Sequence, residues 1–491
     1  SSRRTHTKGL CSGLDRPLPD PLCAGLDTDL VVTGWCHHSD FPVSSLELEV
    51  DGRRFPAEFH SFRRYERKGS AAWGAFGCVV SIPACQWPRS IEMHLRAVLS
   101  TGGVATASLG RLNLRPGRVA DPAPPEVYSR SLSADPVVVC MATYNPPPEL
   151  FARQIRSLRA QTLRDWVCVI CDDHSRHDRF ANLLSVVGHD PRFRIYRQPT
   201  NRGFYRNFEQ CLALVPPTAR FVALADQDDE WRPDKLASLH GGFGPRTTLV
   251  YSDMRLVRPD GTVLSPTYWA SRRNNYSNFA SLLLANTVTG AASMFRRELL
   301  DVLLPFPPAF GDAFHDHWLS CVALACGEMR FVDRPLYDYV QHQGNVVGHY
   351  GPKPLPGYAR VGQWLAFFRP SKLAMNCRAF LATGRATYFA HALRIRQWTR
   401  TLPARCAGQM TAEKRVALRR VATMHASPAG WLWLLLRPFR HLDGVSDTVS
   451  IEFHLLNALM WEKYQSFKSR LFSRWVRRTE EAGGDEIRKA A

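Results

Sequence analysis

A regular alternation of short apolar runs and helix-like segments, between residues 136 and 225, constrains the fold of this chain most. Val137–Met141, Val167–Cys171 and Phe221–Ala225 are uninterrupted apolar runs that predict buried strands. Apolar residues recur at helical spacing in 150–158 and 203–214, between these runs. Strands that alternate with helices pair in parallel and place helices on both faces of one sheet. We therefore predict an α/β fold with a Rossmann-like, mostly parallel sheet.

Polar residues follow three of the predicted strands directly. They are Thr143 and Tyr144, Asp172 and Asp173, and Asp226 to Asp228. In sheets of this kind ligands bind in the crevice beyond the carboxyl ends of the strands. Carboxylates crowded at a strand end repel one another, and a divalent cation with a phosphate group would neutralise them. The pattern indicates an enzyme that handles a nucleoside diphosphate, with a solvated acidic turn as the alternative.

The rest of the chain divides by composition into further segments. Residues 1–28 are rich in Pro, Gly and charge, and predict a flexible arm. In residues 29–115 apolar and polar positions alternate and break at Asp51-Gly52 and Gly102-Gly103, which is typical of hairpins in a small β-sandwich. We expect a proline-rich linker at 116–135, the α/β domain at 136–350 and a basic helical region at 351–491.

Positive charge is concentrated in the last quarter of the chain. The net charge is +19, and residues 361–491 contain 22 Lys and Arg against 9 Asp and Glu, a surplus of 13. Such an excess implies an anionic partner. Trp431 to Leu436 are apolar and precede Arg437, a combination that suits the interfacial zone of a bilayer. A core helix packed on the α/β domain is the alternative for this segment.

The cysteines and the hydropathy of the chain indicate the cellular compartment in which the protein works. Thirteen cysteines are scattered, and no second Cys or His pair has zinc spacing. We expect buried free thiols, which suit a reducing cytosol. Residues 1–10 lack the apolar core of a secretion signal, and no window reaches the roughly 18–20 apolar residues of a membrane span. The sequence therefore predicts a cytoplasmic protein, peripheral on the inner face of the plasma membrane.

Seven short motifs in residues 136–350 are similar, in type and order, to those of the inverting glycosyltransferases of family 2. They are Ala142–Asn145, Cys171–Ser175, Asn201–Phe204, Asp226–Leu236, Thr289-Gly290, His315–Trp318 and Gln341–Gly348. The region resembles the bacterial rhamnosyltransferase branch of that family. The resemblance implies the GT-A fold. A β-sandwich before this domain and a helical region after it resemble the arrangement in galactofuranosyltransferases of the same family.

The resemblance implies a catalytic set that depends on a divalent cation, Mn²⁺ or Mg²⁺. Asp226 and Asp228 match the positions that serve ribose and metal, and His342 matches the third protein ligand of the metal. Asp316 matches the general base, which would take the proton of the attacking acceptor hydroxyl. One base and a direct displacement give inversion at the anomeric carbon. The alternative for Asp316 is a helix N-cap, which could coexist with the base role.

Two further groups of residues complete the predicted site. We expect the nucleotide to be bound by Thr143, Tyr144, Asp172, Asp173, Asn201, Gly203 and Asp226. We expect the donor and acceptor pocket to be lined by Asp229, Trp231, Thr289, Gly290 and His317. Asp173 would accept the N3–H of uracil or thymine, a donor that cytosine lacks.

These residues predict a non-processive transferase that moves a sugar, with rhamnose as the best match, from a dTDP- or UDP-sugar donor to a glycan or lipid-linked acceptor. UDP-galactofuranose is an alternative donor. A glycolipid-binding protein built on a transferase fold is the alternative without catalysis. We expect no nucleic-acid partner, because the basic region contains no recognisable nucleic-acid motif and its arginines interleave with Leu, Phe and Trp.

Overall fold

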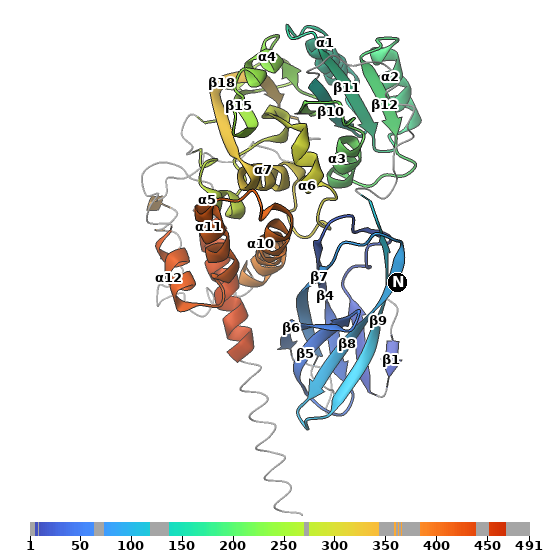
Figure 1. Cartoon of the computed structure of the whole chain (residues 1–491), viewed down its shortest axis with the longest axis vertical. Coiled ribbons are helices and arrows are strands. Elements are labelled where there is room, and N and C mark those ends of the chain that lie inside the picture. The colour runs from blue at the N-terminus through green and yellow to red at the C-terminus, as the bar shows by residue number, and fades with distance from the viewer. Residues whose placement is uncertain are drawn as a thin grey trace, which may run out of the picture.

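The computed structural model describes residues 5–7, 9–62, 73–117, 137–269, 274–342, 358–359, 362, 365, 383–437 and 451–467. Within these ranges an N-terminal β-sandwich, an α/β domain and a group of C-terminal helices follow one another along the chain (Figure 1). The α/β fold predicted from the strand–helix alternation is confirmed.

The N-terminal part consists of strands that share one apolar core. They are β1 (Thr5–Thr7), β2 (Leu10–Leu14), β3 (Leu22–Cys23), β4 (Thr28–His38), β5 (Val43–Val50), β6 (Arg53–Phe62), β7 (Trp73–Ile82), β8 (Arg89–Leu99) and β9 (Val104–Arg115). The first half of β6 pairs with β5 and its second half pairs with β7, so β6 passes from one layer to the other. Inward-facing residues of both layers, such as Leu48 and Phe76, form the core between them.

The prediction of a flexible arm at 1–28 is wrong for the described residues of that segment. β2 pairs with β4 and β3 pairs with β9, and Leu10 and Leu22 are buried in the sandwich core. The strands are short and separated by prolines, so the local composition is that of a loop. Their pairing partners lie elsewhere in the chain, and local composition does not report such contacts.

The α/β domain contains one mixed sheet with helices on both faces. Its first half comprises β10 (Val137–Thr143), α1 (Pro148–Arg159), β11 (Trp166–Asp172), α2 (His177–Val187), β12 (Phe193–Arg197), α3 (Phe204–Ala213), β13 (Phe221–Ala225), β14 (Glu230–Trp231) and α4 (Lys235–His240). Its second half comprises β15 (Thr247–Val257), β16 (Val263–Ser265), α5 (Phe279–Leu284), η2 (Gly290–Ala292), β17 (Ser293–Arg296), η3 (Arg297–Leu299), α6 (Leu300–Leu303), α7 (His315–Cys326) and β18 (Glu328–Val340).

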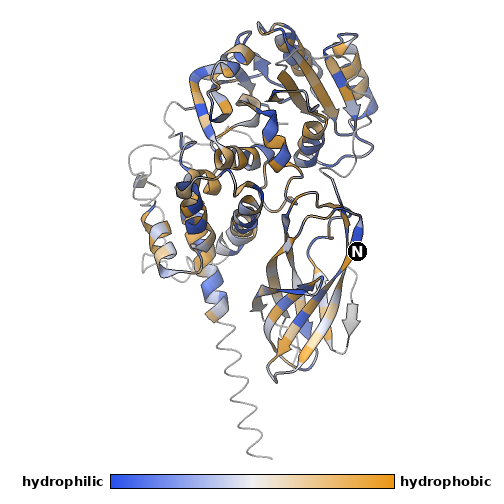
Figure 2. Cartoon of the chain, viewed as in Figure 1, coloured by the Kyte–Doolittle hydropathy of each residue, from blue (hydrophilic) through white to orange (hydrophobic). Residues whose placement is uncertain are grey.

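The strand order is β12-β11-β10-β13-β17-β15-β18-β14. The first four strands are parallel, as predicted, but β17 lies antiparallel between β13 and β15, so the far half of the sheet is mixed. Figure 2 shows the central strands in the orange of hydrophobic residues, which fits strands covered on both faces. Thr143 pairs with Asp172 and Met141 pairs with Ala225, so β10, β11 and β13 end at one edge. This register brings the polar residues that follow these strands together.

The C-terminal helices pack on both preceding parts. They are a π-helical turn (Tyr388–Ala392), α10 (Leu393–Cys406), α11 (Ala412–Thr423), α12 (Pro428–Leu436) and a helix at 451–467. The predicted helical region at 351–491 is helical in these segments, and much of the rest of it lies outside the described residues. Most of the predicted linker, at 116–135, also lies outside them.

Helix α10 joins the sandwich to the α/β domain through polar contacts. The Gln397 side-chain amide donates to the carbonyl oxygens of Asp29 in β4, at 2.6 Å, and of Pro308 in the α/β domain, at 3.0 Å. The Arg405 guanidinium likewise donates to the carbonyl oxygens of Asp27 and Pro305. These donors are buried and their partners come from two different parts of the chain, so α10 holds the three parts as one unit.

Two predictions about the chain as a whole can be checked in the described residues. No helix there combines the length and apolar character needed to cross a bilayer. The cysteines there are free thiols, and most of them are buried.

Candidate active site

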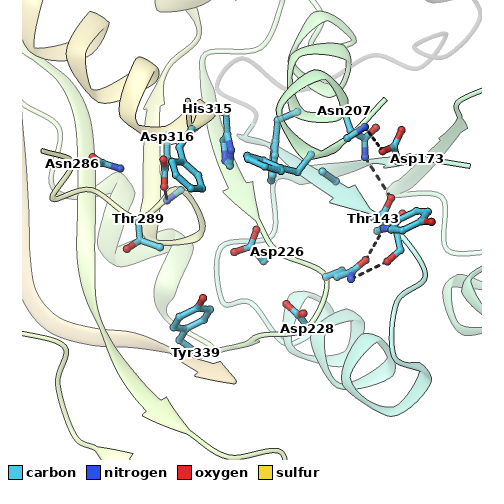
Figure 3. A pocket seen from close by; sticks show the side chains of 18 of the residues that line it. Thr143, Asp173, Asn207, Asp226, Asp228, Asn286, Thr289, His315, Asp316 and Tyr339 are labelled. Atoms are coloured by element: carbon cyan, nitrogen blue, oxygen red, sulfur yellow. Dashed lines mark hydrogen bonds between the residues drawn. The ribbon is translucent and has the colours of Figure 1, made fainter. Parts of the chain in front are cut away.

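A cavity of about 740 Å³ opens at the edge where β10, β11 and β13 end (Figure 3). One wall comes from the loops after these strands and from the start of α3, and the other from the Asn286–Gly290 segment and the first turn of α7. Ten of the predicted site residues line it: Thr143, Tyr144, Asp173, Asn201, Gly203, Asp226, Asp228, Thr289, Gly290 and Asp316. The site thus lies where a parallel sheet binds its ligands.

Backbone hydrogen bonds fix the loop after β11 and the loop before α3. Both oxygens of the Asp173 carboxylate accept backbone N–H groups, from Arg202 and Gly203, each at 2.8 Å. The Asn201 side-chain amide donates to the carbonyl oxygen of Asp173 at 3.2 Å. Gly203 has a φ of 79°, a conformation that a residue with a Cβ adopts only under strain. Burial raises the pKa of Asp173, and the two N–H donors oppose that shift.

Asp172 does not line the cavity, contrary to the prediction that it binds the nucleotide. Its carboxylate is buried and accepts hydrogen bonds from the backbone N–H of Ser175 at 3.0 Å, the Ser175 hydroxyl at 2.5 Å and the Thr143 hydroxyl at 3.2 Å. The hydrogen bonds from Ser175 and Thr143 hold the Asp172 carboxylate in the interior, whereas Asp173, the next residue, lines the cavity. Asp172 fixes the turn that presents Asp173.

The end of β13 places two carboxylates in the middle of the cavity (Figure 3). Burial, and then the charges of Asp228 and Asp316, raises the pKa of Asp226 to about 7. The His342 ring nitrogen Nε2 lies 2.8 Å from Oδ2 of Asp228. The predicted ligands Asp228 and His342 are therefore in contact, although His342 comes from beyond the end of β18.

The donor set of this pair fits a divalent cation. Among the described residues, no group of three or more His, Cys, Asp and Glu side chains is arranged to hold a metal by itself. Mg²⁺ in phosphate-transfer sites is usually held by one or two carboxylates together with substrate phosphates rather than by a cage of protein ligands. A cation at this position would also offset the repulsion that raises the pKa of Asp226. Carboxylate oxygens and one imidazole are acceptable to Mn²⁺ as well.

Asp316 lies in the first turn of α7, across the cavity from Asp226. The backbone N–H of Gly290 donates to its Oδ2 at 3.2 Å, whereas its Oδ1 has no hydrogen-bond partner. Burial raises the pKa of Asp316 to about 6, and backbone N–H donors oppose the shift. The alternative that Asp316 is the N-cap of this helix is wrong, because Phe314 occupies that position. The carboxylate is thus oriented by Gly290 through Oδ2, and its Oδ1 is buried without a partner.

Three residues predicted to line the pocket are buried elsewhere. Asp229 is fully buried, and its Oδ1 accepts the backbone N–H of Val340 at 3.4 Å. Trp231 is buried, and the ammonium group of Lys235 lies over its ring, 3.7 Å from the ring centroid. His317 donates from Nε2 to the carbonyl oxygen of Leu282 at 2.6 Å and packs edge-on against Trp398 of α10.

A second group of cavity residues was not predicted. They are Ala142, Phe204, Asn207, Phe208, Gln227, Tyr268, Asn286, Thr287, Val288, Phe314, His315 and Tyr339. Phe204 and Phe208 are four residues apart after Gly203, a helical spacing visible in the sequence. Tyr339 and Asn286 come from distant segments that only the folded sheet brings to the cavity.

His315 forms part of an aromatic wall of the cavity. Its ring stacks on Phe208 with a centroid distance of 3.8 Å, and Phe204 meets it edge-on. Burial lowers the pKa of His315 to about 3, so the ring is neutral. Neither ring nitrogen has a hydrogen-bond partner in the protein. Nε2 would be 2.9 Å from a Cβ added at Gly290, which requires a glycine at this position unless the ring moves.

The Gln227 side chain ties the loop after β13 to the loop after β10. Its Oε1 accepts the backbone N–H of Tyr144 at 2.8 Å, and its Nε2 donates to the carbonyl oxygen of the same residue at 3.3 Å. This paired contact resembles the pairing between neighbouring strands. It holds the acidic segment Asp226–Asp228 in register with Thr143.

Comparisons with known proteins agree with this geometry. Residues 138–304 match the family model described as Glycosyl transferase family 2. The chain is 27% identical over 137 residues to the uncharacterized protein y4gI of Sinorhizobium fredii, which is 27% of this chain and 15% of that protein. It is 35% identical over 107 residues to the succinoglycan biosynthesis protein ExoW of Rhizobium meliloti, which is 21% of this chain and 33% of that protein. The alignments thus span a third or less of these two relatives.

Among solved structures, the chain is similar to S. aureus TarS 1-349 in complex with UDP-GlcNAc, with 13% sequence identity and a TM-score of 0.38. That alignment covers 67% of this chain and 90% of the TarS chain. The segment that matches the family model, residues 138–304, runs from β10 to α6 and so contains the strands whose ends form the cavity. The matched segment ends before α7 and β18, so Asp316 and His342 lie beyond it.

Proposed function

We propose that the protein is a divalent-cation-dependent, inverting, non-processive glycosyltransferase that uses a nucleoside-diphosphate sugar. The observation that carries this proposal is the position of Asp316 opposite Asp226 and Asp228 in one cavity of a family 2 domain. A diphosphate leaving group needs positive charge at one end of the site, and the attacking hydroxyl needs a base at the other. The two ends of this cavity supply groups suited to these two tasks.

Asp316 is the group that takes the proton of the acceptor hydroxyl. The Asp316 side chain lines the cavity, and the Gly290 N–H orients its carboxylate there. The raised pKa makes the carboxylate a stronger base than an ordinary aspartate, while it still ionises below neutral pH. Direct displacement of the diphosphate by that hydroxyl inverts the anomeric carbon.

Asp228 and His342 would hold the cation, with Asp226 beside them. When bound, the cation supplies electrostatic stabilisation to the diphosphate as it leaves. The fold positions these groups. The Gln227 side chain fixes the segment between the two carboxylates, and His342 lies just beyond the end of β18.

Thymidine or uridine diphosphate is the nucleotide we propose for the donor. Asp173 and Thr143 line the end of the cavity remote from Asp316 (Figure 3), and Tyr144, which follows Thr143, also lines the cavity; the diphosphate and the sugar would lie between the two ends. Each Asp173 oxygen already accepts one backbone N–H and keeps a lone pair for a base N3–H. Rhamnose is the sugar we propose, on the resemblance to rhamnosyltransferases, with galactofuranose as the alternative.

The acceptor we propose is a hydroxyl of a cell-envelope glycan, free or attached to a lipid carrier. The relative named as a succinoglycan biosynthesis protein supports a role in polysaccharide assembly. We also propose that the protein works at the inner face of the plasma membrane, which the free thiols and the basic C-terminal helices favour.

The test is donor turnover across a panel of dTDP-, UDP- and GDP-sugars, each with Mn²⁺, with Mg²⁺ and with a chelator. We expect release of nucleoside diphosphate from a thymidine or uridine donor only when a cation is present. Turnover of a different donor with cation dependence would correct the sugar and retain the mechanism. Binding of glycolipid without turnover of any donor would favour the non-catalytic alternative and refute the proposal.

A further inference from the structure

Helix α12 is apolar around its whole circumference although one face lies at the protein surface. Its sequence, Pro-Ala-Gly-Trp-Leu-Trp-Leu-Leu-Leu, contains no charged residue. A surface helix of a globular protein normally directs polar residues outward and apolar residues inward. Figure 1 shows α12 at the outer edge of the helical region, and Figure 2 colours it orange to pale.

The inward and outward faces of α12 can be separated by burial. Gly430 and Leu434, four residues apart, are buried against the neighbouring helices. Leu432, Leu435 and Leu436 lie on the opposite side and are 56%, 39% and 49% exposed. Their spacing of three and four residues places them on one face. We call these three leucines the α12 outer face.

Basic residues of α11 border this face. The Arg420 guanidinium lies 6.0 Å from the centroid of the Trp433 ring, so α11 contacts α12 on this side. Arg419 and Arg420 are both exposed. Val416 lies one helical turn before Arg420 and is also exposed.

Arg437 directly follows the apolar run, but it is not one of the exposed basic residues. It is buried and pairs with Glu452 at 2.5 Å, and it donates to the Ser281 hydroxyl at 2.6 Å. These contacts anchor the C-terminal end of α12 to the protein. The outer face is therefore presented on a helix whose position is fixed from within.

We propose that the α12 outer face and the arginines of α11 dock onto the surface of an anionic lipid bilayer. Leucines and tryptophans beside arginines are the composition of helices that lie in the headgroup region of a membrane. The nine residues of α12 give it a length of about 14 Å, too short to cross the roughly 30 Å of a hydrocarbon core, so it lies along the surface.

Charge complementarity selects the bilayer over a second copy of the chain as the partner. Residues 361–491 hold 22 basic and 9 acidic residues, and the chain as a whole carries +19. Two copies that met through this face would bring like charges together, whereas anionic headgroups attract each basic residue near the surface. The inference deepens the proposed location at the plasma membrane by naming the surface that makes the contact, and it does not depend on the transferase activity.

The experiment is flotation of the full chain with vesicles of phosphatidylglycerol or of phosphatidylcholine. The variant is Leu432→Asp with Leu435→Asp, since both side chains are exposed and their replacement leaves the core intact. The matched control is Leu184→Asp on α2, a leucine that is 45% exposed on a helix of the α/β domain. A second variant, Arg419→Glu with Arg420→Glu, tests the charged part of the surface.

We expect the unmodified chain to float with phosphatidylglycerol at least about 10-fold more strongly than with phosphatidylcholine. The double aspartate variant should lose at least about 10-fold in vesicle binding, and the double glutamate variant should lose a similar factor. The Leu184→Asp control should bind like the unmodified chain.

Three outcomes would overturn the proposal. They are absence of binding to either vesicle, unchanged binding of the double aspartate variant, and a concentration-dependent dimer that the aspartates disperse. Donor turnover with a soluble acceptor separates this inference from the proposed function. Vesicle binding by a chain that turns over no sugar nucleotide would refute the transferase and leave the membrane surface standing.

Discussion

Replacing Asp316 by Asn tests the central assignment with little structural disturbance. The Asp316 Oδ2 accepts the Gly290 N–H at 3.2 Å, and an asparagine carbonyl can accept the same hydrogen bond. The Thr289-Gly290 loop should therefore keep its position against α7. What the amide lacks is basicity, so the variant should bind the donor normally and fail to take the proton of the acceptor hydroxyl.

The expected loss follows from the role of one positioned base. Removal of such a group typically lowers the rate about 10²–10⁴-fold, which corresponds to about 3–5 kcal/mol of activation free energy. Burial raises the pKa of Asp316 to about 6. With that pKa roughly nine in ten carboxylates are ionised at pH 7 and roughly one in ten at pH 5. The base must be ionised, so kcat/KM should fall about tenfold as pH decreases through this range.

Sugar transfer, donor affinity and fold have to be measured on the same variant. Release of nucleoside diphosphate reports transfer, titration calorimetry reports donor binding and thermal unfolding reports the fold. Asp301→Asn is the matched control, because it removes a carboxylate that pairs with Arg297 at the surface, away from the cavity. Turnover within about threefold of the unmodified protein would remove Asp316 from the mechanism, since a lost base costs far more. A pH profile without a limb near pH 6 would contradict the assigned basicity.

Three further substitutions probe other parts of the site. His342→Ala removes the imidazole that contacts Asp228, and should raise the cation concentration for half-maximal turnover about 10-fold or more; an unchanged cation titration would exclude His342 as a ligand. Gly290→Ala places a Cβ 2.9 Å from Nε2 of His315. The variant should lose about 1–3 kcal/mol of unfolding free energy and displace the Asp316 carboxylate, whereas unchanged stability and kcat would refute the close packing. Lys235→Met removes a buried ammonium group that donates to the Ala291 carbonyl at 2.5 Å. The free energy of unfolding measured in urea should fall by about 3 kcal/mol. An unchanged free energy of unfolding would mean that the charge of Lys235 is dispensable.

Local pattern predicted the half of the site that follows parallel strands. Each apolar run of the α/β domain is a strand, and the residue directly beyond its end faces the crevice because the register aligns the strand ends. Asp173 and Asp226, which directly follow β11 and β13, and Thr143, the last residue of β10, were found in this way. Asp172, the last residue of β11, faces the interior instead, because Ser175 and Thr143 hold its carboxylate by hydrogen bonds that the strand pattern does not predict.

Contacts between distant segments set the limit of that prediction. Trp231 and Asp229 stand beside Asp228 in sequence, but the chain turns inward there, and Lys235 with Trp231 forms a buried charged contact. His317 stands beside Asp316, yet one residue along a helix is a rotation of about 100°, which directs it to α10. Neighbours in sequence were therefore assigned to the cavity although the backbone geometry separates them.

The packing of α7 on α10 also implies an order in which the parts of the site fold during synthesis. His317 and Trp318 of α7 contact Trp398, and α10 in turn holds Pro305 and Pro308 through buried hydrogen bonds. During synthesis the segment that matches the family leaves the ribosome well before Trp398 does. The helix that carries Asp316 can therefore pack against α10 only late in synthesis. The strands that form the nucleotide-binding end of the cavity can fold earlier, whereas the Asp316 end depends on Trp398, about eighty residues further along the chain.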